Sequence, residues 1–264
     1  MVLESLLDPR KISKSYIRLG VVGAFYAIVA GLLAYYMFRD NASIVMVFFT
    51  VMACIPFMYS LMKAEENKEE SLLTEKSFMS EYGHVLMGLL TLFIGVTLGY
   101  LALFLIVSEP VQATLFSAQQ SAITSINGRI TFEGPLADIF INNLSVLGLS
   151  IVFAFLYGFG AITIIVWNSS VVAAAIGNFM VAKGGMAVGL WAFIRYMIHG
   201  IPEIAAYLIA GLAGGIISVA IINHDIGTKK WKKVVIDAMQ LVVLSILLIM
   251  ISALIEVFVT PWLY

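Results

Sequence analysis

The chain has 264 residues, of which 61% are hydrophobic and 12% charged, and its mean hydropathy is +1.01. Soluble globular domains carry about 25% charged residues, so this composition excludes that class and indicates an integral membrane protein. The formal net charge of −1 provides no basic surface for nucleic acid, and the single Cys54 leaves neither a disulfide nor a cysteine metal site within one chain. We therefore expect one all-α, multi-pass domain over residues 1–264 in the cell membrane.

Seven membrane-spanning helices are predicted from the apolar runs, because about 20 helical residues cross roughly 30 Å of hydrocarbon. The basic cluster before the first run is followed by no small-residue cleavage site, which favours a retained span over a signal peptide. The fifth run is short, and if it is re-entrant the number of spans falls to six. Residues 168–183 are interpreted as an amphiphilic connection. The predicted spans are 18–38, 42–62, 83–107, 143–167, 185–200, 201–222 and 234–258.

The basic residues predict the orientation of these spans, since cytoplasmic loops hold the excess of Lys and Arg. Clusters in the N-terminal tail, in 63–81 and in 223–233 would all lie on one side, together with Lys183. The other side would receive only Arg39 and Arg129. We therefore expect a cytoplasmic N-terminus and a C-terminus outside, an arrangement that leaves Arg195 poorly explained.

The segment 108–142 is the longest polar stretch and is predicted to lie outside the membrane. It is too short for a core of its own. One interpretation is a lid of short amphipathic helices at the membrane interface. The alternative is a docking surface for an extracytoplasmic protein partner.

The sequence Gly200-Ile201-Pro202 predicts a broken helix at 199–203, because proline removes a backbone donor and its ring clashes with the preceding turn. A plain turn between two helices would explain the flanking His199 and Glu203 as charges that suit helix ends. Alternatively, the i, i+4, i+8 spacing that begins at Arg195 places three ionisable residues on one face, as in the broken helices of transporters. The candidate polar cluster comprises Arg195, His199, Glu203, Asn142, Asn143 and Asn168.

Small residues at Gly211, Gly215 and Ser218 predict a face on which another helix packs closely, and Gly214 extends it. Packing within one chain and packing in a homo-oligomer are both consistent with this pattern. Glycines at such spacing allow helix backbones to approach. We expect this face to be covered by a helix and the rest of the surface by the lipid bilayer.

The second half of the chain contains three short motifs: Phe140-Ile141-Asn142-Asn143, Trp167-Asn168-Ser169, and His199-Gly200-Ile201-Pro202-Glu203 leading into Ala210-Gly211-Leu212-Ala213-Gly214. In these motifs the chain resembles the integral membrane proteins related to stage II sporulation protein M. The resemblance covers residues 138–222, with Leu144 and Ser145 where the family usually has a basic residue, and residues 1–107 carry no resemblance. It implies a membrane bundle and a scaffolding role, because the family's founding member is associated with a machine that anchors peptidoglycan-degrading partners during engulfment.

Three classes of function remain from the sequence. The resemblance favours an integral membrane scaffold or assembly protein, which is not an enzyme and needs no cofactor and no metal. The predicted helix break favours, as the alternative, a transporter or channel for a small polar solute or ion. An intramembrane metalloprotease would need a further ligand beside His199 and Glu203, and the sequence contains no HExxH motif. We therefore assign no catalytic residue.

Overall fold

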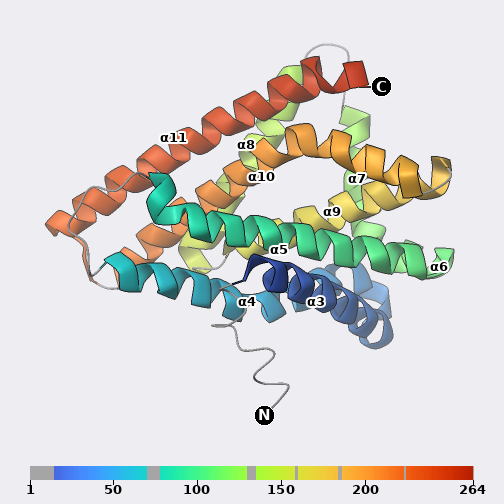
Figure 1. The fold of residues 1–264 in the computed structure, drawn as a ribbon, viewed down its shortest axis with the longest axis horizontal. Helices are drawn as coiled ribbons and strands as arrows, with labels where there is room; N and C mark the ends of the chain where they lie inside the picture. The colour runs from blue at the N-terminus through green and yellow to red at the C-terminus, as the bar shows by residue number, and fades with distance from the viewer. Residues whose placement is uncertain are drawn as a thin grey trace. The chain divides into compact units, whose positions relative to one another are not determined.

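The computed structural model describes residues 15–69, 78–129, 135–157, 160–183, 186–222 and 224–263, and these form helices with no strand among them. Figure 1 shows the succession of helices along the chain. A helix satisfies its backbone hydrogen bonds within its own segment, which is what a lipid environment requires. The prediction of an all-α membrane protein is confirmed.

The helices are of two kinds, long apolar ones and short ones that connect them. The short ones are η1 (Arg39–Asn41), α6 (Glu109–Leu115), α7 (Ser117–Arg129) and η2 (Thr260–Leu263). The long ones are α3 (Tyr16–Met37), α4 (Ala42–Glu69), α5 (Phe78–Ile106), α8 (Pro135–Tyr157), α9 (Gly160–Lys183), α10 (Met186–Ile222) and α11 (Lys229–Phe258).

Seven segments in the described part of the chain are long and apolar enough to cross a membrane, which agrees with the predicted number. They are Tyr16–Met37, Arg39–Phe57, Leu86–Ile106, Leu136–Phe155, Ile162–Ala182, Phe193–Ile222 and Trp231–Trp262. The number agrees, but the division of the chain between residues 135 and 222 differs from the prediction in two places.

The first difference is that the predicted span 143–167 is divided between two helices. Helix α8 begins at Pro135, where proline suits the first turn of a helix, and α9 begins at Gly160. The residues 168–183, predicted as a connection, are therefore the last two thirds of a helix that is long and apolar enough to cross a membrane. The prediction went wrong because Asn168 suggested an interface, whereas its side chain is half-buried by protein.

The second difference is that the predicted spans 185–200 and 201–222 are one helix. Helix α10 continues through Pro202 for 37 residues, a length of about 55 Å, which is nearly twice the thickness of the hydrocarbon. Figure 1 shows it as a single ribbon that bends between its ends. The break predicted at 199–203 is therefore a bend within a helix and not the end of one.

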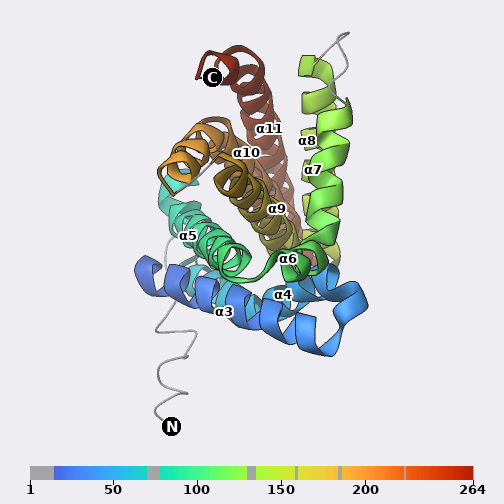
Figure 2. The same ribbon diagram turned by 90° about the vertical axis from the view of Figure 1, so that its right-hand side faces the viewer.

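The chain divides into two compact units. One comprises Met1–Gln120 and Val166–Ala174, and the other comprises Ser121–Ile165 and Ala175–Tyr264. In the first unit α3 packs against α4 and α5 (Figure 2). A Cβ added at Gly95 would overlap the backbone of Gly20, and one added at Gly99 would overlap that of Ala24. Glycine at these positions lets α3 and α5 approach with their backbones in contact.

In the second unit α10 packs against both α8 and α11. One cluster of the buried core of this unit comprises Leu147, Ile164, Ala206, Tyr207, Ala210 and Ile249. Buried hydroxyls add hydrogen bonds between the helices, as where Ser150 of α8 donates to the Tyr207 carbonyl at 3.0 Å. This packing fixes the part of α10 that contains the predicted polar cluster.

Candidate functional site

The bend of α10 is stabilised from the neighbouring helix α11. Pro202 has no backbone N–H, so the Ile198 carbonyl loses its partner within the helix. At the next residue, the His199 carbonyl accepts a hydrogen bond from the Ser252 hydroxyl of α11 at 2.8 Å. Serine hydroxyls of neighbouring helices commonly bond to the backbone near a proline in membrane helices. Ser252 therefore ties the bend of α10 to α11, one residue after the carbonyl that Pro202 deprives of its helical donor.

Gly200 makes room for an aromatic ring at the same bend. A Cβ at this position would lie 2.9 Å from Cε1 of Tyr196, which is one turn earlier in α10. The Tyr196 ring meets the His199 ring edge-on, with their centroids 5.0 Å apart. Because the helix does not end here, we attribute Gly200 to the packing of this ring and not to a turn.

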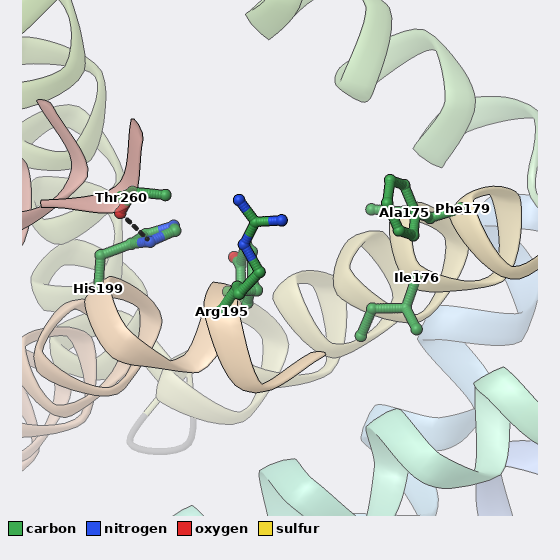
Figure 3. Close-up of a pocket in the computed structure, with 7 residues that line it drawn as sticks. Ala175, Ile176, Phe179, Arg195, His199 and Thr260 are labelled. Carbon is green, nitrogen blue, oxygen red and sulfur yellow. Dashed lines mark hydrogen bonds between the residues drawn. The ribbon is translucent and has the colours of Figure 1, made fainter. Parts of the chain in front are cut away.

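A cavity of about 150 Å³ lies beside this part of α10 (Figure 3). The Arg195 guanidinium points into the open space, and the His199 ring is turned toward Thr260. Both basic side chains are buried, Arg195 being 8% exposed and His199 7%. The cavity is lined by Ala175, Ile176 and Phe179 from α9, by Arg195, Tyr196 and His199 from α10, and by Thr260 from η2.

The hydrogen bonds of Thr260 indicate which nitrogen of His199 carries a proton. The Thr260 hydroxyl donates its single proton to the Ile255 carbonyl at 3.3 Å. Its oxygen also lies 3.3 Å from His199 Nδ1, and this contact is a hydrogen bond only if Nδ1 is the donor. A neutral His199 is then protonated at Nδ1 and has Nε2 as its acceptor nitrogen.

Glu203 makes its hydrogen bond away from the cavity lining. Its Oε1 accepts from the Tyr207 hydroxyl at 2.9 Å, one turn further along α10. The structure thus brings Arg195 and His199 into one cavity, whereas Glu203 is not among the residues that line it. The predicted pairing of Glu203 with Arg195 stays a prediction.

The predicted asparagines lie on other helices. Asn142 is exposed on α8 and its amide lies 3.4 Å from Oδ1 of the buried Asn143. Within the described part of the chain, Asn143 Nδ2 is buried without a hydrogen-bond partner. Asn168 lies on the part of α9 that belongs to the other unit. Its participation in the cluster therefore also stays a prediction.

The predicted packing face of α10 is buried, and at Gly214 its partner is known. A Cβ at Gly214 would lie 2.5 Å from the Ile151 carbonyl oxygen and 3.1 Å from the Ala154 Cβ, both on α8. The close approach is therefore made within one chain. Gly211, Gly215 and Ser218 are also buried.

Sequence reasoning missed four residues that build the site: Tyr196, Tyr207, Ser252 and Thr260. Two of them had a signal, because Tyr196, His199, Glu203 and Tyr207 follow one another at helical spacing. Ser252 had no comparable signal, since its partner His199 is 53 residues away in the sequence. Nothing local in the sequence points to Thr260, since its partner is 61 residues away.

The residues described by the structure contain no group of three His, Cys, Asp or Glu side chains placed to hold a metal ion. The cavity instead combines one guanidinium, one imidazole, a threonine and a tyrosine with three apolar residues. Such a lining suits water or a small anionic group, because its charged member is a cation.

The comparisons with known proteins identify a family and no individual relative. Neither a search of curated proteins nor a search of solved structures found a match to the chain. A family model described as stage II sporulation protein M matches residues 42–261, which extends the predicted resemblance over 138–222 in both directions. The expectation that residues 1–107 carry no resemblance is therefore wrong from residue 42 onward. Since the match covers most of the sequence, the chain belongs to the stage II sporulation protein M family.

Proposed function

We propose that this protein is an integral membrane scaffold that assembles with a protein partner and is not an enzyme. Membership of the stage II sporulation protein M family supports this, because the resemblance to that family implies a scaffolding role. A scaffold needs a rigid bundle with an accessible face outside the hydrocarbon. Helices α6 and α7 supply polar residues for such a face between two spans.

The observation that carries the proposal is the size of the cavity at the bend of α10. Pockets for small organic molecules measure about 300–1,000 Å³. The cavity beside Arg195 measures about 150 Å³, and three of its seven lining residues are the apolar Ala175, Ile176 and Phe179. A solute site of ordinary size is therefore not formed there, which supports a scaffold over a transporter of organic solutes.

The proposed orientation places the N-terminus in the cytoplasm and the C-terminus outside. If the seven apolar segments cross the membrane in turn, all but four of the 15 Lys and Arg residues of the sequence would lie on the N-terminal side. The exceptions are Arg39, Arg129, Lys183 and Arg195. The positive-inside rule supports this orientation, and the new boundaries put Arg195 beside the outer end of its span.

The second candidate function is an ion or proton pathway. One observation favours it, which is that a buried guanidinium, Arg195, points into a cavity beside a helix interrupted by proline. Ionisable residues within membrane spans commonly mark such pathways. The cavity could hold about five water molecules at roughly 30 Å³ each.

Photocrosslinking tests the scaffold proposal on the exposed face of α6. A photoreactive amino acid at Ala113 is expected to capture a partner protein in intact cells, and the partner should co-purify with the unmodified protein in a fixed ratio. The same reagent at Phe155, which is exposed on α8 within a span, serves as the control because lipid covers that position. A second copy of this chain as the sole captured protein would indicate a homo-oligomer.

The result that would contradict the scaffold proposal comes from proteoliposomes. The purified protein should carry no ion or solute current that depends on Arg195. Flux in the wild type that is lost in Arg195→Gln, together with no partner captured at Ala113, would favour the pathway.

A further inference from the structure

We propose that the cavity beside Arg195 binds the phosphate group of a membrane phospholipid. The guanidinium is the charged group of the cavity lining, and it points into the open space (Figure 3). A planar guanidinium donates two parallel hydrogen bonds to phosphate oxygens, which makes arginine the preferred side chain for this group. Thr260 and His199 hydrogen-bond to one another at the same wall, and the cationic Arg195 is the anchor of the site.

The size of the cavity suits a headgroup phosphate and excludes the remainder of a lipid. A volume of about 150 Å³ admits one phosphate group with a few water molecules. It is too small for acyl chains, which must therefore lie outside it. The site would hold the lipid by its charged group alone.

Two exposed tryptophans indicate that the cavity lies at the level of the headgroups. Trp191 is 54% exposed one turn before Arg195 on α10, and Trp262 is 88% exposed two residues after Thr260. Tryptophan is enriched where the hydrocarbon meets the headgroups. Both flank the residues that line the cavity, so a phospholipid phosphate is available at the depth where the guanidinium lies.

A stripe of apolar side chains leads away from the cavity along α10. Ile194, Ile198 and Ile201 are all exposed, and with Trp191 they follow the i, i+3, i+7, i+10 spacing of one helix face. Acyl chains would pack on this stripe while the phosphate contacts Arg195. A free phosphate ion would gain nothing from these isoleucines, and this favours the lipid as the source of the phosphate.

Native mass spectrometry of the detergent-solubilised full chain tests the proposal. Added phosphatidylglycerol is expected to remain bound to the wild type, and Arg195→Gln should weaken its binding about tenfold, as expected for the loss of a charge-assisted hydrogen bond. Arg195→Lys keeps the charge but not the paired donors, so an intermediate loss is expected. The matched controls are Arg39→Gln and Arg39→Lys, because Arg39 is exposed and lies over the Tyr35 ring. Both should bind lipid as the wild type does.

Two further ligands distinguish the source of the phosphate. A galactolipid without phosphate should bind equally and weakly to all variants, and excess inorganic phosphate should not displace phosphatidylglycerol. Displacement by inorganic phosphate would show a free-anion site and would overturn the lipid assignment. Equal lipid binding by the wild type, Arg195→Gln and Arg195→Lys would overturn the site itself. If Arg195→Gln does not fold, the comparison of Arg195→Lys with the wild type decides whether the site exists.

Discussion

Exchanging a single glycine for alanine at the contact between α8 and α10 tests the packing of the second unit. An alanine Cβ at Gly214 would lie 2.5 Å from the Ile151 carbonyl oxygen and 3.2 Å from the Phe155 backbone nitrogen. These are backbone atoms that cannot rotate away, so the two helices must separate by about 1 Å to restore ordinary contact. Overpacking of this kind costs about 1–3 kcal/mol. Gly214→Ala should therefore lower the free energy of unfolding by that amount, less the gain in helix propensity.

The chain offers a matched control for this substitution on the partner helix. Gly148 lies within α8, and a Cβ built there would meet nothing within 4 Å. Gly148→Ala gains the same helix propensity, about 0.8–1.0 kcal/mol, without a collision. Unfolding by increasing SDS in mixed micelles, followed by tryptophan fluorescence, should show Gly148→Ala as stable as the wild type or more so. An equal midpoint for Gly214→Ala and Gly148→Ala would refute the packing argument.

Three further outcomes follow from the bend of α10. Ser252→Ala should lower the free energy of unfolding by about 0.6–1.7 kcal/mol in the same assay, because the His199 carbonyl loses its donor. Thr260→Val should remove the hydrogen bond of His199 Nδ1 and so abolish the protection of its proton from exchange with water. NMR of protein with nitrogen-labelled histidine measures this exchange. Glu203→Gln should impair partner assembly measured by co-purification while stability falls little, because a glutamine oxygen still accepts from Tyr207.

Each of these substitutions has a control. Ser145 is exposed and donates to a carbonyl of its own helix, so Ser145→Ala should leave stability unchanged. His224 is exposed at the end of α10 and supplies a reference signal for the NMR measurement. Glu256→Gln, near the end of α11 and expected at the membrane edge, should leave assembly intact. The reasoning fails where a variant and its control behave alike.

The number of spans was predictable from hydropathy, but it agreed with the structure through two errors that cancel. The sequence predicts a connection over residues 168–183 because of the asparagines there, whereas these residues belong to α9. It also predicts two spans separated at Pro202, whereas both lie in the single helix α10. Hydropathy averages over a helix and does not distinguish a polar side chain that faces protein from one that faces water. Whether a proline ends a helix depends on packing elsewhere in the chain, here against α8 and α11, and the local sequence does not contain that information.

The candidate site was predictable where one helix contains it. Arg195 and His199 are four residues apart, and their spacing places both on one face of α10. The structure brings both to the cavity. The other lining residues belong to α9 and to η2, which contains Thr260. Only tertiary packing brings these elements next to α10. Glu203 accepts a hydrogen bond from Tyr207, and its predicted pairing with Arg195 stays a prediction.

Cysteine accessibility at two positions tests the central claim most directly, namely that α9 crosses the membrane and α10 returns as a single helix. Cys54 is the only cysteine, so Cys54→Ala gives a clean background for Lys183→Cys and Thr228→Cys. These positions lie at the end of α9 and just before α11, with α10 between them. The account predicts that a membrane-impermeant reagent added to intact cells labels position 183, and that position 228 is labelled only after the cells are opened. Labelling of both positions from the same side would contradict it.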